Sequence, residues 1–234
     1  MFEFNKKSNL LESTAQTFPL QDVRDPNLYR DFFNYDEVPK VVFNFRVVPI
    51  NMPDKIWITD TTFRDGQQSR QPYTVEQIAH LYRLLAQLGG PQGVIRASEF
   101  FVYTRKDQEA VAKCMNMGLE FPQITTWIRA SKKDFQLVKD IGVEETGILV
   151  SCSDYHIFQK MHMTRHQAMD HYMAVVRECI ETGIRPRCHF EDITRADFYG
   201  FVLPFASHLM DLMQDTGVPI KIRACDTLGY GITY

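Results

Sequence analysis

The sequence lacks the features that mark secreted, membrane-spanning and nucleic-acid-binding proteins. Its five cysteines are scattered and form no CxxC pair, so we expect neither a disulfide framework nor a structural zinc site, and a reducing cytoplasm is the expected location. No run approaches the roughly 18 apolar residues that cross a membrane, and the first residues, MFEFNKK, hold no apolar stretch for a signal peptide. The net charge of −3, with no basic block, gives nucleic acid no compositional support.

What remains is the composition of an ordinary globular protein. Hydrophobic residues make up 44% and charged residues 24% of the 234 residues. This length can bury a sizeable core in one large domain or two small ones.

Residues 1–54 differ from the rest in being rich in proline and poor in periodicity. Proline restricts itself and the residue before it, so long helices are not expected here. We expect an extended arm that lies over the following domain or over a partner subunit, which favours a homodimer. A partly disordered leader is the alternative, but the aromatic residues favour burial; they are Tyr29, Phe32, Phe33, Tyr35, Phe43 and Phe45.

From residue 55 onward, short apolar runs alternate with longer helical segments. The predicted strands are Ile56–Asp60, Val94–Ser98, Gln123–Ile128, Glu145–Val150, Arg187–Phe190 and Pro219–Ala224. The predicted helices are Thr74–Leu88, Lys106–Asn116, Lys132–Ile141, Arg165–Thr182 and Ala196–Thr216. Thr74 followed by Gln77 is a helix-start signal, and glycines after the helices predict left-handed caps; these are Gly118, Gly142, Gly183 and Gly217.

Strict alternation of strand and helix predicts a parallel sheet, either open and doubly wound or closed as a (β/α)₈ TIM barrel. An open nucleotide-binding sheet should have a glycine-rich turn after its first strand. Here that turn reads DTTFRDGQQ, with one glycine and two carboxylates, which favours the barrel. Because a barrel closes with eight strands and six are predicted, we expect residues 55–234 to be a partial TIM-barrel catalytic domain, truncated after about the sixth strand. A true six-stranded open domain is the alternative.

The turn after the first predicted strand is the strongest candidate site. Asp65 at a strand end can offer a carboxylate oxygen to a hard cation such as Mg²⁺ or Mn²⁺. Its neighbour Arg64 can stabilise a developing enolate or alkoxide oxygen. Gly66 is expected to permit the tight turn that aims both side chains inward.

A second cluster of polar residues, HFEDITR, follows the fifth predicted strand. Glu191 could act as a base or hold a water, and Arg195 could clamp a substrate carboxylate with two hydrogen bonds. A helix start that favours acidic residues is the alternative explanation.

Four further positions lie where a barrel places its working groups. Thr227, in the run CDTLGYG after the sixth strand, offers a hydroxyl to a substrate carboxylate. Glu99 ends the second strand and Arg129 the third; each could instead belong to a structural ion pair. His156 follows the fourth strand and is either a pocket residue or a structural one.

These motifs, in this order, resemble the metal-dependent barrel family of 2-isopropylmalate synthase, homocitrate synthase and 3-hydroxy-3-methylglutaryl-CoA (HMG-CoA) lyase. The resemblance covers about residues 55–234. The run from Ser153 to His156, followed by Lys160 and Thr164, and the run EDITR resemble the synthase branch. The whole pattern, with the long arm, is most similar to the Re-face citrate synthases of anaerobic bacteria, and Trp127 stands where homocitrate synthases carry a histidine.

The resemblance implies a role for each candidate residue. Asp65 would ligate a divalent metal, Mn²⁺ or Mg²⁺ first and Zn²⁺ or Co²⁺ as alternatives. Arg64 and Glu191 would be catalytic. Arg64 would polarise the 2-oxo carbonyl, and Glu191 would be a site carboxylate. The remaining residues would bind or shape the substrate; they are Gln68, Glu99, Arg129, Arg195 and Thr227.

The resemblance also implies an acyltransferase that joins acetyl-CoA to a 2-oxo acid in a Claisen-type condensation. Oxaloacetate, giving citrate, is the first expected acceptor, with 2-oxoisovalerate and 2-oxoglutarate behind it. The alternatives are a metal-dependent lyase or carboxyltransferase on the same barrel, and a catalytically inactive fragment.

Overall fold

The computed structural model describes residues 2–7, 10–13, 24, 41–43, 46–48, 53–129, 132–229 and 231. The chain divides into two units, of which the first comprises residues 1–51 and the second residues 52–233. No helix among the described residues is both long and apolar enough to cross a membrane.

The first unit contains two short antiparallel strand pairs. Strand β1 (Phe2–Asn5) pairs with β2 (Leu10–Ser13), and β3 (Val41–Phe43) pairs with β4 (Arg46–Val48). The aromatic residues from Tyr29 to Tyr35 and Phe45 lie outside the described residues. The predicted 1–54 arm therefore stays a prediction.

The second unit is built on six parallel strands joined by helices. The strands are β5 (Ile58–Asp60), β6 (Ile95–Phe100), β7 (Gln123–Arg129), β8 (Glu145–Ser151), β9 (Arg185–Glu191) and β10 (Lys221–Ala224). The helices are α1 (Val75–Gly89), α2 (Arg105–Met115), α3 (Lys132–Ile141), α4 (Arg165–Glu181) and α5 (Leu203–Thr216). Every predicted strand and helix is present, with shifts mainly at the ends.

The helix boundaries follow from local chemistry. The Thr74 hydroxyl accepts a hydrogen bond from the Gln77 backbone, and the Gln77 side chain accepts one from the Thr74 backbone, which confirms the predicted start of α1. All four predicted cap glycines have positive φ angles; they are Gly118, Gly142, Gly183 and Gly217. A side chain would strain the backbone in this conformation, so glycine ends these segments at low cost.

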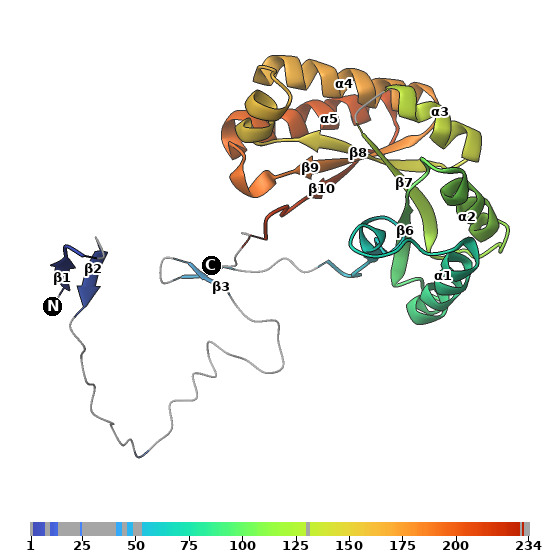
Figure 1. Ribbon diagram of the computed structural model, residues 1–234. Coiled ribbons are helices and arrows are strands. Elements are labelled where there is room, and N and C mark those ends of the chain that lie inside the picture. The colour runs from blue at the N-terminus through green and yellow to red at the C-terminus, as the bar shows by residue number, and fades with distance from the viewer. Residues whose placement is uncertain are drawn as a thin grey trace. The chain divides into compact units, whose positions relative to one another are not determined.

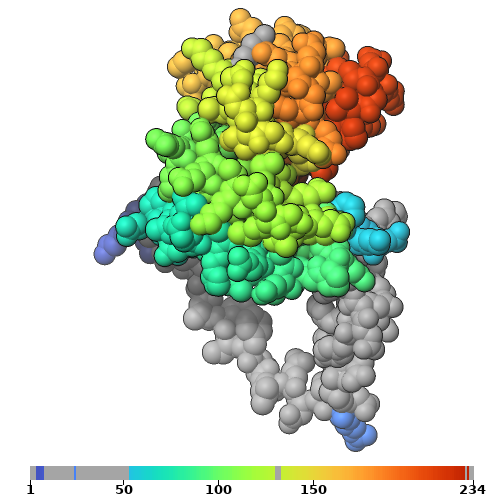
Figure 2. Space-filling view, turned by 90° about the vertical axis from the view of Figure 1, so that its right-hand side faces the viewer, coloured from blue at the N-terminus to red at the C-terminus, as the bar shows by residue number. Residues whose placement is uncertain are grey.

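The six strands lie side by side in the order β10-β9-β8-β7-β6-β5, and every neighbouring pair is parallel. Figure 1 shows the sheet curved, with the helices on its outer side. In Figure 2 teal, green, yellow and orange bands succeed one another over this unit, so consecutive strand–helix units are neighbours in space. The result is a half-barrel, a partial TIM barrel as the alternation predicted.

The two faces of the sheet carry different side chains because successive residues of a strand alternate. The outer face is apolar and buried under the helices, with Ile148, Val150 and Cys188 fully buried. Phe190 of β9 stacks on Phe205 of α5 with ring centroids 5.0 Å apart. The other face carries charged residues, and it forms the candidate site.

Two π-helical turns interrupt the predicted pattern after β8 and β9. Residues Tyr155–Lys160 form the first, where no helix was predicted. The second, Phe198–Val202, delays α5 to Leu203, so the predicted helix start at Ala196 is wrong. The chain first makes a short 3₁₀ turn, Ile193–Arg195, and the Asp197 carboxylate then caps Gly200.

Candidate active site

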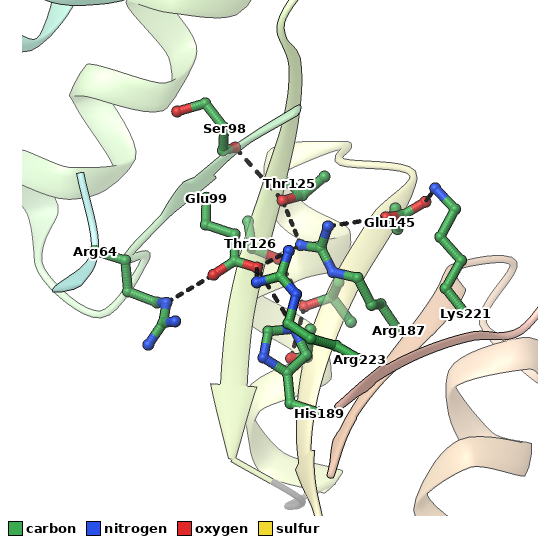
Figure 3. Close-up of polar contacts among 12 residues, drawn as sticks. Arg64, Ser98, Glu99, Thr125, Thr126, Glu145, Arg187, His189, Lys221 and Arg223 are labelled. Atoms are coloured by element: carbon green, nitrogen blue, oxygen red, sulfur yellow. Dashed lines mark hydrogen bonds and ion pairs between the residues drawn. The ribbon is translucent and has the colours of Figure 1, made fainter. Parts of the chain in front are cut away.

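The concave inner face of the half-barrel is lined by polar side chains from neighbouring strands (Figure 3). The strand register places Glu99 beside Thr125, Trp127 beside Gly147, and His189 beside Arg223. Because these positions alternate with the buried apolar ones, they project from the same side of the sheet. Residues distant in sequence therefore converge on one surface.

Glu99 is the centre of this surface. Its side chain is fully buried, and its carboxylate accepts hydrogen bonds from Arg64 Nε at 2.8 Å, Arg187 Nη2 at 2.8 Å and Arg223 Nη1 at 2.7 Å. Nε2 of His189 lies 3.4 Å from the same carboxylate. Glu99 therefore does belong to structural ion pairs, because its carboxylate binds three guanidinium groups. Its direct contact with substrate remains a proposal.

The three arginines shape the electrostatics of the inner face. Burial lowers the pKa of the Arg187 guanidinium, and Glu99 opposes this shift. Burial, reinforced by Arg223, Arg187 and Arg64, lowers the pKa of His189 to about 2. His189 is therefore neutral at physiological pH, and the positive charge of this layer resides on the arginines.

The loop after β5 holds Arg64 and Asp65 at the rim of this surface. Asp60, the last residue of β5, has a structural role, because its carboxylate accepts hydrogen bonds from the hydroxyls of Thr62 at 2.6 Å and Ser98 at 2.7 Å. Arg64 bridges Glu99 to Asp65, since its Nη1 lies 2.7 Å from Asp65 Oδ1. The structure thus brings together the two residues of the strongest motif.

Gly66 does not have the predicted role in this loop. Its φ angle is not positive, and a Cβ atom added there would lie 3.8 Å from its nearest neighbours, which is ordinary contact. The turn is closed instead by the Gly66 N–H, which donates to the Thr61 carbonyl at 3.1 Å, a bond that any residue but proline could make.

Asp65 has the chemistry of a metal ligand. Its side chain is 50% exposed, and among the described residues its Oδ2 atom has no hydrogen-bond partner. A half-exposed carboxylate oxygen suits a hard divalent cation. Within the described ranges, no three His, Cys, Asp or Glu side chains gather closely enough to enclose a metal ion. Asp65 therefore fits one ligand position of a divalent-metal site.

The ends of β8, β9 and β10 form a second polar cluster next to Glu191 and Asp192. Asp192 is fully buried in a left-handed conformation, with φ of 62°, which is uncommon outside glycine and often marks a functional site. Its carboxylate accepts from Arg195 Nη2 at 2.7 Å and Ser153 Oγ at 2.5 Å, and its backbone N–H donates to the Thr227 hydroxyl at 2.8 Å. Arg195 and Thr227 are thereby held together around Asp192.

Arg195 also stacks on an aromatic ring, with its guanidinium carbon 4.7 Å from the ring centroid of Tyr155. Burial is the largest single influence on the Asp192 carboxyl and acts to raise its pKa. The hydrogen bonds from Arg195 and Ser153 and the charge of Arg195 together outweigh burial, so the pKa lies below its ordinary value. The predicted contact of Arg195 with a substrate carboxylate stays a prediction.

The side chains of Gln68 and Arg129 make their described contacts with other residues. Gln68 is exposed and, with Gln67, Pro72 and Phe101, lines a cavity of about 420 Å³. Arg129 is exposed, and its guanidinium lies 5.7 Å from the ring centroid of Tyr103. Among the described residues, no hydrogen bond or ion pair joins either side chain to Glu99 or Glu191, so their substrate roles stay predictions. 

Arg187 and Arg223 were missed by sequence reasoning, and His189, although it begins the HFEDITR run, was given no role. All three lie inside β9 or β10 and not at the strand end. Arginine and histidine are unusual inside a strand that is otherwise buried. Their unusual position was the signal that could have found them. Arg187 and His189 lie just before the EDITR run that the sequence analysis had already selected.

The fold and the site define a class: a partial TIM barrel with acid and arginine groups at the ends of its strands, where barrel enzymes place their chemistry. A family model described as HMGL-like matches residues 55–233. The chain belongs to the HMGL-like family. This finding confirms the family resemblance identified from the sequence.

Curated relatives extend the comparison. Citrate (Re)-synthase of Clostridium kluyveri is 55% identical over 96% of this chain and 49% of its own length. Citrate (Re)-synthase of Syntrophus aciditrophicus is 56% identical over 93% of this chain and 34% of its own length. The chain thus spans about half or less of these relatives.

Among solved structures, hydroxymethylglutaryl-CoA lyase of Pseudomonas aeruginosa matches with a TM-score of 0.53 and 19% identity, over 78% of this chain and 61% of that one. At this identity the match establishes the shared fold.

Proposed function

We propose that the full-length protein is an acyltransferase that condenses acetyl-CoA with a 2-oxo acid, oxaloacetate being the first choice and citrate the product. The similarity to two citrate (Re)-synthases over nearly the whole chain supports this choice. The observation that carries the chemistry is the position of Arg64, hydrogen-bonded to buried Glu99 at 2.8 Å and to half-exposed Asp65 at 2.7 Å.

The reaction has two stages. In the first, a base takes a proton from the acetyl methyl group, and the resulting enolate carbon bonds to the 2-oxo carbon. In the second, water cleaves the thioester, giving the free acid and CoA. Glu191 is the proposed base, since it lies at the end of β9 with a partly exposed carboxylate. Arg64 would stabilise the negative oxygen that forms on the former carbonyl.

A divalent cation held in part by Asp65, Mn²⁺ or Mg²⁺ first, would supply Lewis-acid polarisation of the 2-oxo acid. Arg64 donates to Glu99 through Nε and to Asp65 through Nη1, which fixes the guanidinium and leaves its Nη2 atom without a hydrogen-bond partner among the described residues. Arg195 and Thr227 are proposed to bind the acceptor carboxylate, and Gln68 and Arg129 to shape its surroundings.

The test is the release of free CoA by the full-length protein with acetyl-CoA, Mn²⁺ and each of oxaloacetate, 2-oxoisovalerate and 2-oxoglutarate. We expect release with oxaloacetate. R64M should lower the rate at least about a hundredfold, as expected for a group that stabilises a developing oxyanion. R83M, on the exposed face of α1, is the matched control and should retain activity. No CoA release with any acceptor would overturn the proposal.

A further inference from the structure

The carboxylate of Glu191 is held by one oxygen only. Oε2 accepts a hydrogen bond from the Ser151 hydroxyl, lies 3.0 Å from His156 Nδ1 and lies 3.6 Å from Lys160 Nζ. The described residues provide no hydrogen-bond or ion-pair partner for Oε1. One oxygen of the carboxylate is therefore fixed while the other is available for proton transfer.

Two of these contacts come from a single unusual element. His156 and Lys160 both belong to the π-helical turn Tyr155–Lys160, and such turns occur frequently at functional sites. The hydrogen bond from the Met161 N–H to the His156 carbonyl, 2.9 Å long, has the five-residue spacing of a π-helix. This wider turn lets both side chains reach the same oxygen.

The turn is also tied to the neighbouring carboxylate. The Ser153 hydroxyl donates to Asp192 Oδ2 at 2.5 Å and accepts from the His156 N–H at 3.3 Å. His156 Nε2 lies 3.9 Å from the same Asp192 oxygen. The imidazole thus lies between Glu191 and Asp192, with one ring nitrogen facing each, and its side chain is only 16% exposed.

We infer that His156 is the positioning residue for Glu191, holding Oε2 so that Oε1 faces the inner surface as the base. This inference rests on the proposed function. An ionised carboxylate only accepts hydrogen bonds, so the hydrogen must reside on Nδ1 of His156. His156 acts through Glu191, whereas Lys160, whose side chain is 57% exposed, adds a longer-range attraction.

Three substitutions of His156 in the full-length protein separate positioning from bulk structure. The amide nitrogen of asparagine branches from the same carbon as Nδ1, whereas that of glutamine extends one carbon farther. We expect H156A to lower kcat by on the order of tenfold to a hundredfold, because small misplacements of a reacting group are costly. The KM for oxaloacetate should stay within twofold. H156N should restore most of the kcat, and H156Q should not.

The matched control is H166A, because His166 is an exposed histidine on α4; it should match the wild type. Wild-type kcat in H156A, or no difference between H156N and H156A, would overturn the inference.

Melting curves of each variant show whether it still folds. If the His156 variants do not fold, nitrogen NMR of the imidazole in the full-length wild type and in E191A tests the inference instead. Nδ1 protonation that disappears in E191A supports the inference, and a wild-type ring protonated on Nε2 alone overturns it. If the wild type releases no CoA, the proposed function fails, and the NMR result still tests the contact.

Discussion

Arg187 donates a hydrogen bond to Glu99 at 2.8 Å although the two residues are 88 positions apart in the sequence. Arg64 and Arg223 reach the same carboxylate from the loop after β5 and from β10. Glu99 therefore links the loop after one edge strand, β5, to the opposite edge strand, β10. The same contact that organises the site also holds the fold together, and this coupling leads to the first prediction.

We expect E99Q to destabilise the protein by about 3–5 kcal/mol, since removing one partner leaves buried charges uncompensated. Chemical denaturation of the wild type and the variant measures this difference. E76Q is the control: Glu76 pairs with Lys113 on the surface, and its side chain is 75% exposed, so the midpoint should not move. An E99Q midpoint equal to that of the wild type would show that the three arginines need no anchor.

Gly147 is predicted to be intolerant of any side chain. A Cβ atom there would lie 2.8 Å from His189 Nε2 and 3.0 Å from Trp127 Cδ1. We expect G147A to cost about 1–3 kcal/mol through overpacking, seen as a lower melting temperature. G66A should change the melting temperature little, because its added atom makes only ordinary contacts at 3.8 Å. Equal effects of the two substitutions would contradict this account.

His189 should make stability fall as the pH falls. Its pKa is about 2 in the folded protein and about 6.5 in an unfolded chain. Between these values the unfolded state binds one more proton, so stability rises with pH in this window by about 1.4 kcal/mol per unit. Urea unfolding from pH 4 to pH 6, within this window, measures the slope. H189N should have a shallower slope by about this amount, and identical slopes would mean that His189 does not titrate as described.

The 234-residue chain on its own should bind Mn²⁺ weakly. The described residues offer Asp65 but no group of three acidic, histidine or cysteine ligands. We expect a dissociation constant on the order of 10⁻³ M, as in weak oxygen-ligand sites, measured by electron paramagnetic resonance. D65N should weaken binding further, and D215N, an exposed substitution near the end of α5, should not. Micromolar affinity of the wild-type chain would refute the prediction.

The sequence by itself determined the alternation of strands and helices in the second unit. The periodicity of apolar residues and local signals such as the Thr74–Gln77 capping pair and the glycine caps act within a few residues, so they can be recognised without the fold. The motif around Arg64 and Asp65 was recognisable for the same reason, since its residues are adjacent in sequence and lie next to a strand end.

Only the tertiary structure decided which polar residues meet. The Glu99–Arg223 contact joins positions 124 residues apart, and the Glu191–His156 contact depends on an unpredicted π-helical turn. Strand register sets the first, because it determines which inward-facing residues are neighbours. The second depends on backbone geometry that residue type specifies weakly. Local composition fixed the elements, whereas the partners of each charge were set by the curvature and register of the sheet.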